Sequence, residues 1–275
     1  MHGAGNSFVL TENLHGELQG EDLSVLALRL CDGKTGPGAD GMIVLVPAEN
    51  ADFGMLFYNS DGSLGEMCGN GARCIARYGV EHALVRDAEN IRVQTTAGLV
   101  TGRRVTEELY QVRLNDPSVI EVHREAAGTD CAYVELGDPG IPHAVVLLDD
   151  WDAWERDRLR ELGRALRFAP VFPRGANVSF VKRSGEDSVK AITYERGVED
   201  FTLACGTGCG SIAAALTLMG LVSGDVSIGM PGGLLSVSVR RDGDRIFDIF
   251  LTGPTCLVFE GEVSDELLEG LCRTF

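Results

Sequence analysis

The chain carries one four-residue pattern twice, as Cys68-Gly69-Asn70-Gly71 and as Cys205-Gly206-Thr207-Gly208. The two cysteines are 137 residues apart, about half of the 275 residues of the chain. Other short matches keep nearly the same spacing and order: Gly38-Ala39-Asp40 with Gly175-Ala176-Asn177, Phe57-Tyr58 with Thr193-Tyr194, Ala97-Gly98-Leu99 with Gly232-Gly233-Leu234, and Asp116-Pro117 with Gly253-Pro254. Because matches in one register along the whole chain are not expected by chance, the sequence predicts an internal duplication.

The length suits two domains of about 100–150 residues each. We predict a first domain over residues 1–116 with 255–275, and a second over 117–254. Each half holds short strand-like runs bounded by Gly, Asp, Asn or Pro, and a helix follows each Cys-Gly-x-Gly pattern, over 72–80 and 209–221. Amphipathic outer helices are predicted over 23–30 and 151–166. The predicted fold is therefore α/β of the α+β type, with two similar, strand-rich halves.

Composition excludes several classes of protein. Hydrophobic residues make up 44% of the chain and charged residues 24%, as in globular proteins. With 41 acidic against 24 basic residues, the net charge of −17 repels a nucleic-acid backbone. No run of 18 apolar residues and no signal-peptide pattern occurs, so we expect no membrane partner and a cytoplasmic location. In that compartment the eight cysteines are expected to be thiols.

A cysteine directly before a helix lies beside N–H groups that have no partner within the helix. The helix dipole at this position favours thiolate over thiol and lowers a cysteine pKa from about 8.5 into the range of about 3.5 to 7.5. The N–H groups at Gly69-Asn70 and Gly206-Thr207 form an anion site that suits a carboxylate. If the two halves face one another, one thiolate can remove a proton from a carbon atom and the other thiol can deliver one to the opposite face.

Other interpretations of these residues remain open. Cys68, Cys74, Cys205 and Cys209 form a possible four-thiolate metal set, although their spacings of six and four differ from those of zinc knuckles. Cys68 and Cys205 could instead be a redox pair. Asn59, within Asn59-Ser60-Asp61-Gly62, is typical of a turn, and Glu195-Arg196 is either a surface ion pair or a site that binds a charged substrate group. Without further information, His143 is most simply interpreted as a polar residue at the start of a strand.

Several motifs together resemble the diaminopimelate epimerase family. They are Met1 to Phe8 (MHGAGNSF), Gly38 to Gly41 (GADG), Tyr58 to Ser63 (YNSDGS), Met67 to Cys74 (MCGNGARC), Tyr194 to Gly197 (YERG) and Leu203 to Gly208 (LACGTG). The resemblance runs in the family's order from the first residue to about Gly261. It implies an amino-acid epimerase that needs no cofactor and no metal and interconverts LL- and meso-2,6-diaminopimelate in lysine and peptidoglycan biosynthesis. It also implies two pseudo-symmetric domains, each a strand barrel around a central helix, a site in the cleft between them, and a cytoplasmic homodimer.

The resemblance also assigns roles to individual residues. It implies that Cys68 and Cys205 are the acid/base thiols. The backbone amides of Gly69, Asn70, Gly206 and Thr207 would hold the reacting carboxylate with help from Asn6, and His143 would lie near the same end. The distal amino and carboxylate groups of the substrate would be bound by Asn59, Asn177, Glu195 and Arg196.

Three positions depart from the family pattern. Ser7 stands where the family usually has Asp, and Gly41 stands where some members have a Gln that contacts the substrate. Ile141 replaces an Asn that touches the distal end of diaminopimelate, and its side chain cannot form that hydrogen bond. Losing one neutral hydrogen bond costs about 0.5–1.5 kcal/mol, up to roughly tenfold in affinity. A racemase of another amino acid, such as histidine, is therefore the main alternative, and a thiolate metal-binding or redox-sensing protein is a second one.

Overall fold

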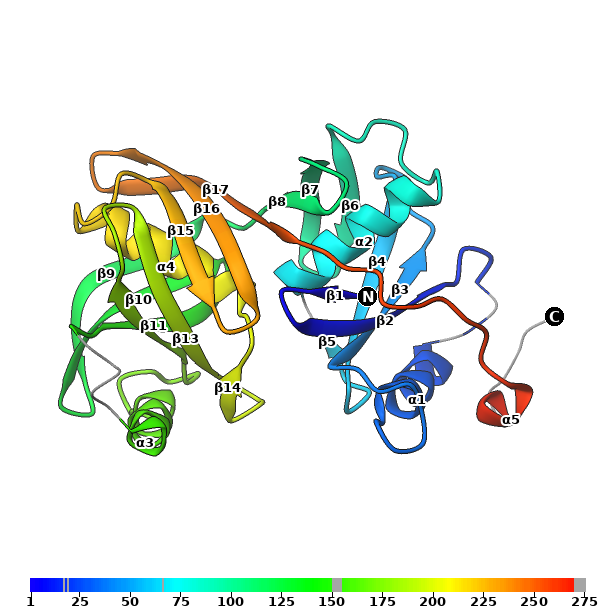
Figure 1. Cartoon of the computed structure of the whole chain (residues 1–275), viewed down its shortest axis with the longest axis horizontal. Coiled ribbons are helices and arrows are strands. Elements are labelled where there is room, and N and C mark those ends of the chain that lie inside the picture. Colours follow the sequence, from blue (N-terminus) through cyan, green and yellow to red (C-terminus); the bar gives the residue numbers. More distant parts are fainter. Residues whose placement is uncertain (17, 19, 66, 150–154, 270–275) are drawn as a thin grey trace. The chain divides into compact units, whose positions relative to one another are not determined.

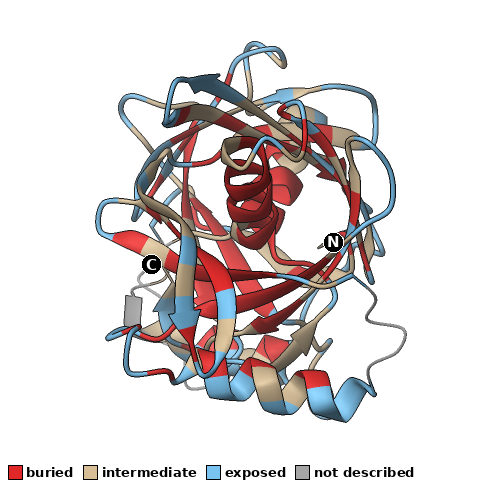
Figure 2. Cartoon of the chain, turned by 90° about the vertical axis from the view of Figure 1, so that its left-hand side faces the viewer, coloured by how far each residue is buried: buried red, intermediate tan, exposed pale blue. Residues whose placement is uncertain are grey.

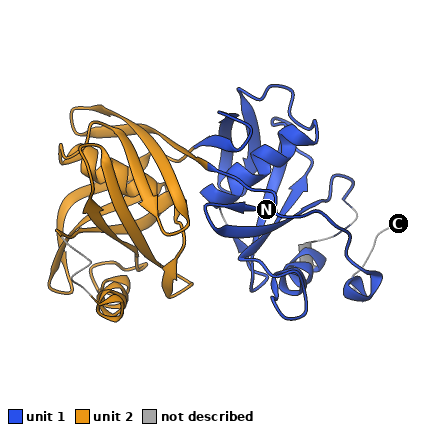
Figure 3. Ribbon diagram, viewed as in Figure 1, with its two compact units in different colours: residues 1–112, 254–275 blue, residues 113–253 orange. Residues whose placement is uncertain are grey.

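The computed structural model describes all residues except 17, 19, 66, 150–154 and 270–275. The chain divides into two compact units, Met1–Val112 with Pro254–Phe275, and Arg113–Gly253 (Figure 3). Most of the regular structure is strand, with a smaller share of helix (Figure 1). The fold is therefore mixed α/β, as predicted.

Unit 1 is built around a parallel pair of strands, β2 (Asn6–Glu12) and β3 (Gly41–Val46), with helix α1 (Gly20–Cys31) between them in sequence. β3 then pairs antiparallel with β4, β4 pairs antiparallel with β5 and parallel with β6, and β6, β7 and β8 follow as antiparallel neighbours. Helix α2 lies between β5 and β6 in sequence. The bounds of the remaining elements are β1 (His2–Gly3), β4 (Phe53–Asn59), β5 (Leu64–Gly65), α2 (Gly69–Glu81), β6 (Ile91–Thr95), β7 (Gly98–Arg104), β8 (Leu109–Arg113) and α5 (Asp265–Leu268).

Unit 2 repeats this order of elements and pairings. β11 pairs parallel with β12, β12 antiparallel with β13, β13 antiparallel with β14 and parallel with β15, and β15 antiparallel with β16. Helix α3 separates β11 from β12, and helix α4 separates β14 from β15, as α1 and α2 do in unit 1. The bounds are β9 (Pro117–Ala126), β10 (Thr129–Gly137), β11 (Gly140–Leu147), α3 (Arg156–Arg167), β12 (Asn177–Arg183), β13 (Ser188–Glu195), β14 (Asp200–Thr202), α4 (Gly206–Leu218), β15 (Asp225–Met230), β16 (Gly233–Asp242) and β17 (Arg245–Pro254).

Each unit buries the helix that follows its Cys-Gly-x-Gly pattern. Helix α4 is Ala-rich and almost wholly buried, and it contacts strands β9 to β12, β15 and β16 (Figure 2). Helix α2 contacts β1, β2, β3, β6 and β7, and its first residues, Gly69 to Ala76, are buried. A helix that is apolar on all sides is stable only when other elements surround it. The residue before each helix is therefore held against a packed core.

The predicted helices agree with α1, α2, α3 and α4, although each observed helix begins before or after the predicted start. Residues 151–154 of the predicted outer helix 151–166 lie outside the described residues, and α3 begins at Arg156. The strands predicted from β-type runs correspond to β3, β4, β6, β8, β11, β12, β13, β16 and β17. In the described part of the chain no helix is both long enough and apolar enough to cross a membrane.

Candidate active site

Cys68 and Cys205 each occupy the position directly before a helix. Cys68 precedes α2 with φ −129° and ψ 114°, and Cys205 precedes α4 with φ −120° and ψ 110°. In both places the cysteine carbonyl accepts the first helical hydrogen bond, from Ala72 at 2.8 Å and from Cys209 at 3.0 Å. Neither helix has an acidic residue in its first turn. The positive end of each helix therefore faces a thiol without a competing carboxylate from the same helix.

The second glycine of each pattern lies in a crowded place at the start of its helix. A Cβ atom built on Gly208 would lie 3.2 Å from Cys205 Sγ and 3.3 Å from Ser179 Oγ. A Cβ atom on Gly71 would lie 2.8 Å from Ile43 Cδ1 and 3.6 Å from Cys68 Cβ. A larger residue at position 208 therefore crowds the thiol of Cys205, whereas one at position 71 crowds Ile43 and not Cys68.

In unit 1, Cys68 belongs to a hydrogen-bonded cluster of side chains. Its Sγ atom lies 3.6 Å from Asn6 Oδ1, and Asn70 Nδ2 donates to the same oxygen at 3.2 Å. The carboxamide of Asn70 accepts in turn from Arg73 Nη2 at 2.9 Å. Asn70 is 1% exposed and Arg73 is fully buried. The predicted site residues Asn6, Cys68 and Asn70 therefore lie together.

In unit 2, Cys205 belongs to a similar cluster. Its Sγ atom lies 3.7 Å from Thr207 Oγ1, which in turn lies 3.1 Å from His143 Nε2. His143 is fully buried on β11, and its Nδ1 atom has no hydrogen-bond partner in the described structure. The structure therefore brings the predicted residues Cys205, Thr207 and His143 together.

Burial determines the protonation of this second cluster. It raises the pKa of Cys205 well above its ordinary value, and the negative charge of Glu195 adds to this increase. The expectation that the helix terminus lowers this pKa is therefore wrong for Cys205, because the loss of solvent outweighs the helix. Burial, with a smaller effect of the positive charge of Arg196, lowers the pKa of His143 to about 3, so its ring is neutral at pH 7.

Asn177 and Arg196 form a third group in unit 2. Asn177, the first residue of β12, accepts from the backbone N–H of Arg196 at 2.8 Å and donates to Pro142 O at 3.4 Å. The Arg196 guanidinium donates to Arg174 O at 3.2 Å. Glu195 Oε2 accepts from Thr202 Oγ1 at 2.8 Å. Glu195 and Arg196 are both partly buried, and each has a hydrogen-bond partner elsewhere in unit 2.

A family model for diaminopimelate epimerase matches residues 1–119 and 137–258 of the chain. The chain belongs to the diaminopimelate epimerase family. It is 36% identical to the diaminopimelate epimerase of Carboxydothermus hydrogenoformans, over 95% of this chain and 97% of that protein. It is 37% identical to that of Methanothrix thermoacetophila, over 98% of this chain and 97% of that protein. The chain is therefore an isomerase, and the resemblance found in the sequence is confirmed.

Solved structures of distant relatives share the fold of this diaminopimelate epimerase family member. One is a phenazine biosynthesis protein of the PhzF family from Bacillus anthracis, with a TM-score of 0.71, 12% identity and 92% of both chains covered. Another is a hydroxyproline epimerase from Agrobacterium vitis, with a TM-score of 0.62, 18% identity, and 92% of this chain and 86% of that chain covered. At these identities the likeness shows the fold alone.

Two positions of interest in the diaminopimelate epimerase family lie apart from these groups. Asn59 ends β4, and its Nδ2 donates to Ser63 Oγ at 2.9 Å within a turn. No hydrogen bond among the described residues joins it to Cys68. Ile141 lies on β11, is partly buried and pairs with Leu136 of β10. Where the family pattern has an Asn, the chain therefore carries an apolar side chain on a strand, two residues before His143.

The other described cysteines of this family member are free thiols. Cys74 and Cys209 are fully buried within α2 and α4 and pack in the core. Cys256 is exposed and donates to Leu257 O. Among the described residues no three His, Cys, Asp or Glu side chains lie close enough to hold a metal ion.

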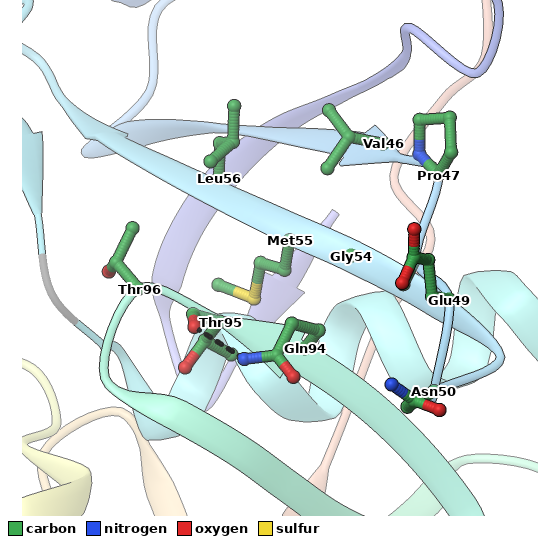
Figure 4. Close-up of a pocket in the computed structure, with 11 residues that line it drawn as sticks. Val46, Pro47, Glu49, Asn50, Gly54, Met55, Leu56, Gln94, Thr95 and Thr96 are labelled. Carbon is green, nitrogen blue, oxygen red and sulfur yellow. Dashed lines mark hydrogen bonds between the residues drawn. The ribbon is translucent and has the colours of Figure 1, made fainter.

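Unit 1 of this diaminopimelate epimerase family member also holds a surface pocket. It has a volume of about 340 Å³ and lies where the β3–β4 connection meets the end of β6 (Figure 4). Its lining includes Glu49, Asn50, Met55, Gln94 and Thr96, and none of the predicted site residues. Gln94 Nε2 in this wall donates to Thr95 O at 3.1 Å.

Sequence reasoning about the diaminopimelate epimerase motifs missed Asp40. Its Oδ2 accepts from Asn6 Nδ2 at 2.9 Å, and so it joins the Cys68 cluster. The internal repeat could have indicated Asp40, because Asp40 occupies the position equivalent to Asn177, which was predicted as a site residue. Arg73 was also missed, although it stands within the quoted motif.

Proposed function

We propose that the chain interconverts LL- and meso-2,6-diaminopimelate without a cofactor, using Cys68 and Cys205 as an acid/base pair. The observation that supports this most directly is the matched placement of the two thiols, each before a buried helix with the same backbone conformation. The relatives named above carry the activity in their names. The product would serve lysine and peptidoglycan biosynthesis.

The proposed reaction moves one proton off the α-carbon and another onto it. A thiolate on one side takes the α-proton, and the electron pair of the broken C–H bond spreads into the carboxylate. The thiol on the other side then gives its proton to the opposite face of the carbon. The configuration inverts, and the two sulfurs exchange protonation states. No redox change occurs, so no oxidant or reductant is required.

The helix N-termini are suited to hold the reacting carboxylate. We assign the backbone N–H groups of Gly69, Asn70, Gly206 and Thr207 to this role, because the first N–H groups of a helix have no partner within it. Charge that develops on the carboxylate in the transition state is stabilised by the same groups. Asn6 and His143 would lie near this end through their contacts with Asn70 and Thr207.

The distal end of the substrate is assigned to Asn59, Asn177, Glu195 and Arg196. Arg196 supplies a guanidinium that can bind a carboxylate through two hydrogen bonds. Asn177 accepts from the backbone of Arg196 and so fixes the start of that segment. Glu195 supplies the opposite charge, which suits the distal amino group.

At the level of the fold, we propose two domains related by internal duplication, each a strand barrel around its central helix. The repeated order of strand pairings in the two units and the burial of α2 and α4 support this. The predicted domain boundaries, the active site in the cleft between the domains, the homodimer and the cytoplasmic location are part of the same proposal. Diaminopimelate is the small-molecule partner.

A second candidate function is the racemisation of another amino acid by the same two thiols. The observation that favours it is Ile141, an apolar residue where the family places a substrate-binding Asn. Histidine is one such substrate. A panel of free amino acids separates the two candidates, because diaminopimelate must be the preferred substrate if Arg196 binds a distal carboxylate.

The test of the proposed function is proton exchange in deuterated water. The enzyme is incubated with LL-diaminopimelate, and deuterium at the α-carbon and the ratio of LL to meso forms are followed by mass spectrometry and chiral chromatography. We expect one deuterium per inversion. Absence of both exchange and inversion at high enzyme concentration contradicts the proposal. Exchange with another amino acid but not with diaminopimelate supports the second candidate.

A further inference from the structure

Two charged residues lie at the ends of the hydrogen-bonded chain that reaches Cys68. Arg73 Nη2 donates to Asn70 Oδ1 at 2.9 Å, and Asn70 Nδ2 donates to Asn6 Oδ1 at 3.2 Å. Asn6 Nδ2 donates to Asp40 Oδ2 at 2.9 Å. The donors therefore all run in one direction, from the guanidinium through two carboxamides to the carboxylate.

The charged ends decide which way the two carboxamides point. A carboxamide can turn over and exchange its oxygen and nitrogen with little change of shape. A guanidinium only donates and an ionised carboxylate only accepts, so Arg73 requires the oxygen of Asn70 and Asp40 requires the nitrogen of Asn6. Both requirements place the oxygen of Asn6 on the side of Asn70 and Cys68.

The orientation of Asn6 matters because of what it presents to the sulfur. Asn6 Oδ1 lies 3.6 Å from Cys68 Sγ and can accept a hydrogen bond from the protonated thiol. With the carboxamide turned over, Nδ2 would face the sulfur and donate to a thiolate. A bond accepted from the thiol stabilises the protonated form, whereas a bond donated to the sulfur stabilises the thiolate.

We propose that Asp40 is a positioning residue for Cys68, which acts by holding the Asn6 carboxamide with its oxygen toward the sulfur. Cys68 is thereby kept protonated and aligned to give a proton. The inference rests on the proposed function for the role of Cys68 in catalysis. The orientation itself follows from the contacts within unit 1.

Hydrogen bonds to the start of β2 hold Asp40 in the position that this role requires. Its Oδ2 accepts from Ser7 N at 2.7 Å and from Ser7 Oγ at 3.1 Å, in addition to Asn6. Its backbone N–H donates to Ser7 O at 3.1 Å. These bonds fix the residue to β2 just before β3 begins, where the two strands pair in parallel, Phe8 opposite Gly41. The carboxylate has little freedom to leave Asn6.

The same positions in unit 2 carry different residues. At the spacing of 137 residues, His143 corresponds to Asn6, Thr207 to Asn70 and Asn177 to Asp40. His143 contacts Thr207 as Asn6 contacts Asn70, but Asn177 donates to Pro142 O and not to the ring of His143. Among the described residues, a carboxylate therefore orients the hydrogen-bond acceptor beside Cys68, and no carboxylate does so for His143 in the cluster of Cys205.

The test measures the reactivity of Cys68 without any substrate. Asp40→Ala, Asp40→Asn and the control Asp52→Asn are alkylated with iodoacetamide over a range of pH. The rate at Cys68 is read by mass spectrometry of its peptide. Asp52 is a suitable control because its carboxylate accepts from Arg92 N at 2.8 Å in the same unit. Cys74, which interacts electrostatically with Cys68, and Arg73, which donates to Gly69 O, stay unchanged in all variants.

We expect Asp40→Ala to lower the midpoint of the Cys68 alkylation profile by about half a pH unit to one unit, since the Asn6 carboxamide is then held by Asn70 alone and its oxygen is no longer fixed beside the thiol. Asp40→Asn keeps an oxygen acceptor for Asn6 and should shift the midpoint by less than half as much. Asp52→Asn should leave it unchanged. An unshifted midpoint in Asp40→Ala overturns the proposal. The proposal is also overturned if the midpoint in Asp40→Asn shifts by half as much as in Asp40→Ala or more, because loss of the negative charge alone then explains the effect.

A second readout links the positioning to turnover. If the chain is an epimerase, kcat of Asp40→Ala should fall by a larger factor than KM rises, because Asp40 acts through Cys68 and not on the substrate. If the wild-type chain shows no epimerisation but the alkylation shift appears, the proposed function fails and the positioning stands. If epimerisation is present and the shift is absent, the positioning fails alone.

Discussion

Cys68 and Cys205 have the same backbone conformation and precede helices of equal length, yet their sulfurs meet different partners. Cys68 Sγ lies beside the amide oxygen of Asn6, and Cys205 Sγ lies beside the hydroxyl of Thr207. Cys205 is also the more buried of the two. The two units therefore present their thiols in the same manner but surround them differently.

Replacing either thiol by a hydroxyl should stop the reaction. Cys68→Ser and Cys205→Ser keep the side chain small, but a serine hydroxyl does not ionise near neutral pH. We expect kcat for epimerisation to fall by at least about a hundredfold in each variant. Cys256→Ser, which changes an exposed thiol, should retain full activity. Full activity in either of the first two variants would contradict the paired-thiol mechanism.

Gly208→Ala should impair activity without loss of stability. The added methyl group would lie 3.2 Å from Cys205 Sγ, so the sulfur must move. A displacement of this kind is expected to lower kcat about ten- to a hundredfold. Alanine is the better helix former by up to about 1 kcal/mol, which offsets steric cost in the thermal midpoint. The matched control is Gly229→Ala, whose nearest neighbour atom is at 3.7 Å. Unchanged kcat in Gly208→Ala would show that the sulfur tolerates the methyl group.

His143 should make folding stability depend on pH. Its pKa is lowered to about 3 in the folded state, below the unfolded value near 6.5. Between these values the unfolded chain binds one more proton, so stability rises with pH and is lost as pH falls below about 6.5. Between pH 7 and pH 5 the wild-type chain should lose about 2 kcal/mol more unfolding free energy than His143→Gln. Urea unfolding at both pH values measures this, and equal losses would mean that the fold does not lower the pKa of the ring.

Arg196→Lys should weaken binding of diaminopimelate more than turnover. Lysine keeps the charge but cannot form two parallel hydrogen bonds with a carboxylate, so KM should rise about tenfold. The backbone bond to Asn177 does not depend on the side chain and should persist. Arg183→Lys, at an exposed strand end of the same unit, is the control. An unchanged KM would remove the assigned role of Arg196 and favour the second candidate function, with its substrate lacking a distal carboxylate.

The four longer helices and nine of the strands were predictable because their patterns are local. The run after Gly208 is apolar on all sides, and it forms the buried helix α4. Strands β9 and β10 were not predicted, because register shifts near Cys131 and Glu135 break the two-residue alternation. Strands β1, β5 and β14 have two or three residues, too few to show a period.

The sequence by itself determined the repeat, the helix after each Cys-Gly-x-Gly pattern and the family, because these depend on residue types at fixed spacings along the chain. Tertiary structure alone decided the surroundings of each thiol. Asp40, Asn6 and Arg73 meet because the parallel pairing of β2 and β3 brings distant segments to the start of α2. The raised pKa of Cys205 likewise reflects packing of the whole unit around it. Hydrogen bonding and loss of solvent depend on neighbours in space, which spacing along a chain does not specify.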